Sequence, residues 1–111
     1  MTHIIKETDH LIIFKQIEIF KLKLQQIILI EKLDEYTFIY SIDQTVKVRK
    51  SLKSIESILP SNFIRTNQSF IINKNHLLRL ERLNSNVYKA FLTNSKQGIV
   101  NKNILNNLLN C

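Results

Sequence analysis

The stretch of sequence that decides the fold of this chain is residues 63–73, which read FIRTNQSFIIN. An arginine, two adjacent amides and two hydroxyls lie there between short apolar runs that favour strands. Such a pattern predicts a strand, a polar loop and a second strand. The loop would present the amides of Asn67 and Gln68 beside the positive charge of Arg65. Amides pair with base edges and arginine attracts phosphate, so the same stretch also indicates nucleic-acid binding.

The length of 111 residues is typical of one domain. We expect a single domain over residues 1–111, with residues 1–8 as a flexible N-terminal extension. Apolar runs such as residues 27–30 are far shorter than the ~18 residues of a membrane span. Glu7 and Asp9 are unlike a secretory signal. The single cysteine, Cys111, cannot form an internal disulfide, which favours a reducing, cytoplasmic location.

The chain is basic, with 16 Lys and Arg against 9 Asp and Glu and a net charge of +7. After Glu81 the sequence contains no further acid, whereas basic residues continue to Lys102. This balance fits an anionic partner, of which nucleic acid is the commonest. A basic protein without a nucleic-acid role remains the alternative, because charge governs association rather than fold.

Most of the chain follows strand patterns. Tyr36, Phe38 and Tyr40 alternate with smaller residues, which predicts a strand with one apolar face. The other predicted strands are residues 10–15, 17–21, 27–30, 45–49, 63–65, 69–72, 77–83 and 87–92. We therefore expect a mainly β domain.

Two segments follow helical patterns instead. Ser51 is suited to cap a short helix over residues 51–59, which Pro60 would end. Residues 104–109 place leucine and isoleucine on one side and asparagine on the other, as in a short amphipathic helix packed on the sheets. With one glycine in the chain, turns must use Asn, Asp and Ser. We expect such turns at residues 43–44, 84–86 and 94–95.

Ordered pieces of the sequence resemble the LytTR family of DNA-binding domains. Residues 27–31 (IILIE) resemble an apolar strand of the family that ends in glutamate, and Tyr36 follows where the family often has tyrosine. Residues 47–52 (KVRKSL) resemble its strand-to-helix entry. Residues 63–73 match its pattern of Arg, three variable residues, Ser, an aromatic, two β-branched residues and Asn. The resemblance covers about residues 10–109.

The resemblance implies a more specific fold and function. The family fold is an elongated stack of small antiparallel β-sheets with about ten short strands, here accompanied by the two short helices. Its members bind double-stranded DNA through loops that enter successive major grooves. It further implies bacterial transcription regulation, either as a stand-alone regulator or as the effector domain of a response regulator. It implies a DNA target made of paired direct-repeat half-sites. It also implies a partner regulator or a homodimer on DNA as the protein partner.

The resemblance also assigns base contacts. Thr37, at the end of the loop over residues 34–37, matches a first contacting position. Asn67 and Gln68 match the second loop, and Gln68 is the better candidate for a base edge. Asn103, before the last helix, matches the third. We expect these side chains to read bases.

Three basic side chains are expected to contact DNA phosphates: Lys32, Arg65 and Lys102. Arg65 has a structural alternative, since it could pair with a carboxylate of residues 31–35 instead. Ser69 and Asn73 are more often structural in such a setting.

Two residues depart from the family pattern. The family usually has serine where this chain has Asn101, and often arginine at or near Asn103. Asparagine can read adenine but cannot make the bidentate contact of arginine with guanine. These departures favour an alternative function, in which a module of the same fold sequesters a partner regulator without binding DNA.

Catalysis has little support in the sequence. His3, His10 and His76 are scattered and lack the spacing of a zinc site. There is no glycine-rich phosphate loop, since the chain has a single glycine. We therefore expect no enzyme activity, no catalytic residue, no metal and no cofactor.

Overall fold

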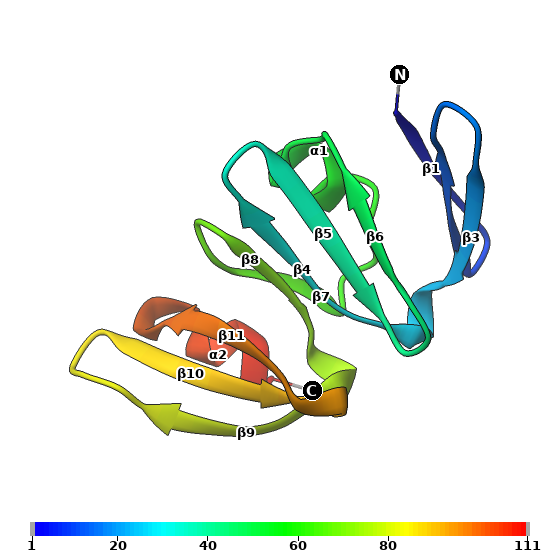
Figure 1. Cartoon of the computed structure of the whole chain (residues 1–111). Helices are drawn as coiled ribbons and strands as arrows, with labels where there is room; N and C mark the ends of the chain where they lie inside the picture. The colour runs from blue at the N-terminus through cyan, green and yellow to red at the C-terminus, as the bar shows by residue number, and fades with distance from the viewer. Residues whose placement is uncertain (1, 111) are drawn as a thin grey trace.

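The computed structural model describes residues 2–110, and Met1 and Cys111 lie outside the described residues. Eleven strands there form three antiparallel sheets with two short α-helices (Figure 1). The N-terminal sheet contains β1 (His3–Glu7), β2 (His10–Phe14) and β3 (Ile19–Lys23). The central sheet, in the order β6-β5-β4-β8-β7, contains β4 (Ile27–Leu33), β5 (Tyr36–Ser41), β6 (Thr45–Val48), β7 (Phe63–Asn67) and β8 (Phe70–Asn73).

The C-terminal sheet, in the order β11-β10-β9, completes the fold. It contains β9 (Leu77–Arg82), β10 (Val87–Leu92) and β11 (Lys96–Asn101). The helices are α1 (Leu52–Glu56) and α2 (Leu105–Leu109). The molecule is elongated, with extents of 45 × 28 × 24 Å. The expected stack of small antiparallel sheets with two short helices is confirmed.

The central sheet is the middle layer, and each of its faces builds a separate core. On one face Ile30, Ile39 and Ile71 pack against the N-terminal sheet and α1. On the other face Leu29 and Ile72 pack against the C-terminal sheet and α2. Burying an isoleucine or leucine side chain of this kind stabilises the fold by about 1.5–3 kcal/mol. The two cores hold the three sheets in a fixed stack, which positions the loops at their ends.

Strand β5 differs from its predicted pattern because both of its faces are covered. Thr37 and Ile39 point to one core and are fully buried. Phe38 and Tyr40 lie on the other face, where their rings stack with centroids 6.3 Å apart. Both aromatic rings are only half-buried. The expectation of a single apolar face was wrong, because a strand in a middle layer has no solvated face.

The expected flexible extension over residues 1–8 is also corrected. His3–Glu7 form strand β1, which pairs with β2 in antiparallel register. Ile4 lies opposite the buried Ile13 and packs against the first core. Thr8 adopts a φ of 53°, which turns the chain into β2. Apolar packing and the ladder of β1 with β2 therefore order this segment.

Both helices form where the sequence predicts them, but they are shorter. The Ser51 hydroxyl accepts a hydrogen bond from the Ser54 amide at 3.1 Å and caps α1. In α2 the buried Leu108 packs into the second core, whereas Leu109 is 57% exposed. Among residues 2–110, no helix has the length and apolar character needed to cross a membrane. The turns at residues 94–95 use left-handed geometry, with φ of 60° and 58°.

Tyr40 should ionise at unusually high pH. Burial, together with the hydrogen bond that its hydroxyl donates to the Glu31 carboxylate at 3.0 Å and the charge of that carboxylate, raises its pKa from 10.0 to about 12. The neutral phenol therefore stabilises the fold below pH 10, and this contribution is lost as the pH rises through about 12. We expect the phenolate absorbance to show a transition near pH 12 that disappears in Tyr40→Phe. Absence of a phenolate transition near pH 12 that depends on Tyr40 would contradict it.

Candidate nucleic-acid interface

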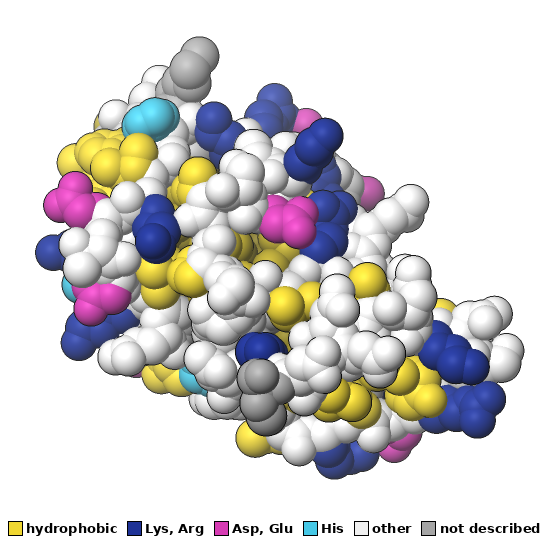
Figure 2. All heavy atoms as spheres, turned by 180° about the vertical axis from the view of Figure 1, so that it is seen from behind, with side chains coloured by type: hydrophobic (Ala, Val, Ile, Leu, Met, Phe, Trp, Pro, Cys, Tyr) yellow, Lys and Arg dark blue, Asp and Glu magenta, His cyan; other side chains and the backbone are white. Residues whose placement is uncertain are grey.

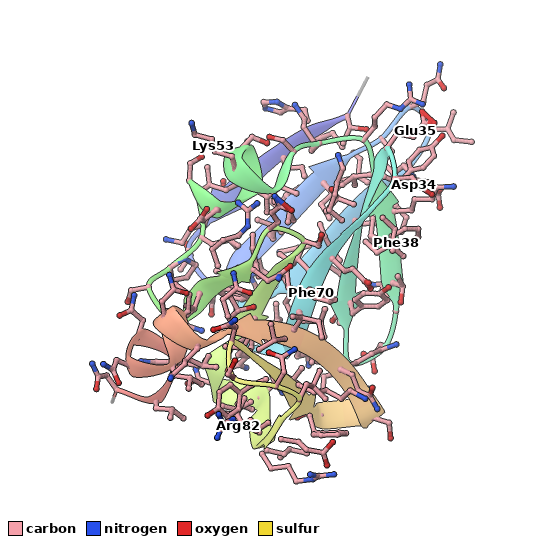
Figure 3. The ribbon with its side chains drawn as sticks, turned by 90° about the vertical axis from the view of Figure 1, so that its left-hand side faces the viewer. Asp34, Glu35, Phe38, Lys53, Phe70 and Arg82 are labelled. Carbon is pink, nitrogen blue, oxygen red and sulfur yellow. The ribbon has the colours of Figure 1, made fainter. Side chains whose placement is uncertain are left out.

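Several loops of the central and C-terminal sheets lie along one side of the molecule. The turns β4–β5, β7–β8 and β9–β10 and the end of β11 follow one another down the left-hand side of Figure 1. Figure 3 views this side directly, with Asp34 and Glu35 at one end, Arg82 at the other and Phe70 between them. The predicted contacting loops therefore belong to one continuous surface.

A β-bulge fixes the second predicted loop. Arg65 pairs with Ile71 and Asn67 pairs with Phe70, so Thr66 is an extra residue in β7. Bulges of this kind bend a strand and re-aim its side chains. Thr66 is fully buried, and its hydroxyl donates to the Ile99 carbonyl at 2.9 Å. This bond fastens the β7–β8 hairpin of the central sheet to β11 of the C-terminal sheet.

Asn67 and Asn101 join the second and third loops. The Asn67 carboxamide oxygen accepts from the Ser69 amide at 2.8 Å and closes the turn. Its nitrogen donates to the Asn101 side-chain oxygen at 3.2 Å. Asn67 is half-buried, and both atoms of its amide have partners within the protein. A base contact by Asn67, as predicted, would require these bonds to open.

Arg65 braces the β7–β8 turn from inside. Its Nε donates to the Asn67 carbonyl at 2.9 Å, and its Nη2 donates to the Gln68 carbonyl at 2.7 Å. Its third nitrogen lies 3.5 Å from the Glu56 carboxylate of α1. The predicted structural alternative paired Arg65 with a carboxylate of residues 31–35, but the partner is Glu56. Its guanidinium thus fixes the backbone that carries Gln68.

Gln68 and Asn103 come together at the surface, although they lie far apart in sequence. Both side chains are exposed, and both line one shallow depression of about 220 Å³. The other residues that line it are Arg65, Thr66, Asn67, Asn101 and Ile104. The structure therefore brings two of the predicted base-contacting amides to one place, with the braced hairpin beneath them.

A second depression of about 550 Å³ adjoins the first and adds an amide that the sequence analysis missed. It shares Asn101 and Asn103 with the first and is also lined by Asn86, Val87 and Lys102. The Lys102 amide donates to the Asn86 carbonyl at 2.9 Å, which holds the β9–β10 turn against the end of β11. The sequence marks Asn86 as a turn residue, but its proximity to Lys102 depends on strand pairing.

The first predicted loop is arranged differently. Thr37 is fully buried and its hydroxyl donates to the Lys50 carbonyl at 2.7 Å. The structure therefore contradicts the predicted base contact of Thr37, because strand alternation points its side chain into the core. The exposed tip of the turn carries Asp34 and Glu35, and Glu35 pairs with Arg49.

Positive charge flanks the amides. Lys102 is exposed beside Asn103. Lys32 is half-buried, and its backbone amide donates to the Ser69 carbonyl at 2.9 Å, so it lies next to the β7–β8 turn. Among the carboxylates of residues 2–110, only Glu56 pairs with a residue that lines the two depressions. Within residues 2–110, no three His, Cys, Asp or Glu side chains gather as a metal site.

Comparisons with known proteins identify the fold and the family. No curated protein matches the chain. The solved structures include the LytTr DNA-binding domain of a protein described as a methyl-accepting/DNA response regulator from Bacillus cereus. It is 22% identical, with a TM-score of 0.77, and the match covers 99% of this chain and 97% of the other. Residues 17–110 match the LytTr DNA-binding domain family, which is defined by DNA binding rather than by catalysis. The chain belongs to the LytTR family of DNA-binding domains.

Proposed function

We propose that this chain binds double-stranded DNA sequence-specifically in bacterial transcription regulation and reads bases in the major groove from its loops. The observation that carries the proposal is the pair of exposed amides, Gln68 and Asn103, on one shared depression. Family membership supports DNA as the partner. The net charge of +7 supports an anionic ligand.

In this proposal Gln68 and Asn103 make the base contacts. A carboxamide offers a donor and an acceptor side by side, which matches the N6 and N7 edge of adenine in the major groove. Because Asn103 stands where the family often has arginine, we expect adenine rather than guanine at the base pair it reads. Gln68 would read a neighbouring position from the adjacent loop.

Arg65, Asn67 and Asn101 act as positioning residues. Base readers must be held close to their productive geometry, since a loose site loses both affinity and discrimination. Arg65 holds the Gln68 carbonyl, and Asn67 links the two loops through Asn101. This assignment replaces the base contact of Asn67. It also gives Asn101 a structural reason to differ from the family's serine, which removes one motive for the sequestering module.

Lys32 and Lys102 would bind phosphates on either side of the amides. The molecule is 45 Å long, compared with roughly 34 Å for one DNA turn, so one domain can extend along about one turn of the duplex. The family resemblance favours paired direct-repeat half-sites with one domain on each. A partner regulator or a second copy would then sit on the neighbouring half-site.

Replacing Lys102 with alanine tests the electrostatic part of the proposal. Each phosphate contact that is lost removes about 0.9 from the slope of log K against log salt for duplex DNA. We expect Lys102→Ala to lower the slope by about this amount and to weaken all duplexes alike, as measured by fluorescence anisotropy over a salt series. The matched control is Lys6→Ala, an exposed lysine of β1 on the other side of the molecule (Figure 1). Equal slopes for Lys102→Ala and Lys6→Ala would place Lys102 off the DNA.

A further inference from the structure

The N-terminal sheet has two different faces. In β2, the buried Leu11 and Ile13 point toward the first core, and His10, Ile12 and Phe14 point the other way. No other described element lies over this second face in Figure 1. We call it the outer face of the N-terminal sheet. It is made by strands β1 and β2, which precede the residues matched by the family, and by β3.

The outer face carries large apolar side chains in two of its three cross-strand rows. Cross-strand register places Phe14 between His3 of β1 and Ile19 of β3. The His3 and Phe14 ring centroids lie 5.9 Å apart, and Ile19 is 67% exposed. In the next row Ile12 lies between Ile5 of β1 and Lys21 of β3, so a lysine borders the apolar side chains at the β3 edge. These rows form a continuous surface of large side chains rather than scattered single residues.

The apolar surface continues into the β2–β3 turn, where Ile17 is 92% exposed. Figure 2 shows hydrophobic side chains gathered over this part of the molecule, with acidic and basic side chains around them. Contiguous exposed apolar patches with a polar rim mark interaction sites, whereas isolated exposed residues need no explanation. An exposed, flat three-stranded face of this kind is therefore a candidate contact surface for a partner.

The rim of the face carries charges of both signs. Its third row pairs Glu7 of β1 with His10 of β2, and His10 with Lys23 of β3. Asp9 and Glu18 stand in the two flanking turns. Glu7, Asp9 and Glu18 alternate with Lys15, Lys21 and Lys23, so the rim lacks the uniform positive charge that suits DNA or an anionic membrane. The β1 edge of the face carries Glu7 and the β3 edge carries Lys23. A partner whose charges run in the reverse order would be complementary to this arrangement.

We propose that this partner is a second copy of the chain, joined face to face by a two-fold axis that runs along β2. The operation exchanges β1 and β3 while keeping each cross-strand row in place. Glu7 of one copy then lies opposite Lys23 of the other, and the reverse contact is made by symmetry. Phe14 meets the same Phe14 across the axis, and Ile19 meets His3. Lys21 lies over the edge residue Ile5 of the other copy, one row away from Glu7 of that copy. Sheets packed in this way keep their strands within about 30° of one another.

The contact is small, because each copy contributes three strands of five residues. Interfaces of this size are at the weak end of specific protein associations, so the dimer should form reversibly with concentration. A two-fold dimer presents its loops in opposite senses and fits inverted half-sites. Domains on direct repeats do not share such a contact. The proposal therefore concerns the protein off DNA and does not depend on how DNA is read.

A charge exchange tests the proposed pairing on the full chain without DNA. Sedimentation equilibrium should give a mass that rises with concentration from 13.1 kDa toward twice that value. Glu7→Lys and Lys23→Glu should each weaken dimerisation about 10-fold, since like charges then face each other. The double variant restores opposite charges and should dimerise as the natural chain does. Monomers up to about 1 mM in the natural chain would overturn the proposal.

A second pair of variants tests the apolar part without disturbing the fold. Ile19→Lys changes a side chain that is 67% exposed, so its folding cost should be small and its effect on dimerisation large. The matched control is Leu78→Lys in β9, where the leucine is 70% exposed on a different sheet. If Ile19→Lys abolishes the dimer and Leu78→Lys does not, the result supports the outer face as the contact surface. Equal effects of the two variants, or a double charge variant that stays monomeric, would contradict it.

Discussion

Replacing Asn73 with alanine should destabilise the fold by roughly 3 kcal/mol, because it leaves buried polar groups without partners and opens a cavity. Asn73 is fully buried at the end of β8. Its nitrogen donates to the Ile27 carbonyl at 2.8 Å, at the start of β4. Its oxygen accepts from the Asn62 amide group at 2.9 Å and from the Asn75 backbone at 3.0 Å. One side chain thus connects three segments.

The free energy of unfolding in urea measures this effect. Asn75→Ala is the matched control, since its side chain is exposed two residues further along, and we expect a change within about 0.5 kcal/mol. If Asn73→Ala were as stable as the control variant, the amide would not be the structural connection described. A large loss of stability in Asn73→Ala would also assign Asn73 to the fold rather than to DNA binding, because its side chain is inaccessible to a base.

Replacing Gln68 with alanine should remove one base reader and little else. The expected loss on the preferred duplex is roughly 1–3 kcal/mol, with relaxed preference at one base pair and unchanged weak non-specific binding. Gln68 is exposed, and the Arg65 bond to it uses its backbone carbonyl rather than its side chain. The turn should therefore keep its shape in the variant.

Binding to the preferred duplex and to its single base-pair variants measures this loss. The matched control is Gln44→Ala, an exposed glutamine in the β5–β6 turn at the other end of β5. If Gln68→Ala lowered stability and weakened every duplex equally, Gln68 would be a brace for its own loop. Retained discrimination at every base pair would show that it reads none of them.

Local patterns predicted the hairpin around residues 63–73 well, because a strand, a polar turn and a second strand are specified by neighbouring residues. The Ser51 cap is of the same kind, since its partner Ser54 is three residues away. The bulge at Thr66 could not be predicted. It depends on a hydrogen bond to Ile99, which lies 33 residues further along the chain.

The site residues divide in the same way. Gln68 and Asn103 were named from their loops, but their shared depression is produced by contacts between sheets. The base contact of Thr37 was assigned from the family resemblance, whereas the structure buries this side chain fully. The central sheet has a layer on each side, so the smaller residues of β5 point into the first core. Layer order is a property of the whole chain rather than of one strand.

Residues 3–7 and Asn101 show what a single sequence leaves open. Strand β1 is short, and its pairing with β2 and the packing of Ile4 on the first core order it. Asn101 stood out as a departure from the family pattern, but its bond to Asn67 joins residues 34 positions apart. In both cases the residues depend on an interaction with another part of the chain. That part is distant in sequence, or it is identified only once the sheets are assembled.

Selection of bound duplexes from a random pool is the most direct test of sequence-specific reading by these loops. The account predicts enrichment of a defined site with an adenine at the base pairs read by Gln68 and Asn103. It also predicts that the same selection with Gln68→Ala loses the preference at one of these positions only. A pool that stays random after repeated rounds at physiological salt, where non-specific phosphate binding is weaker, would contradict the account.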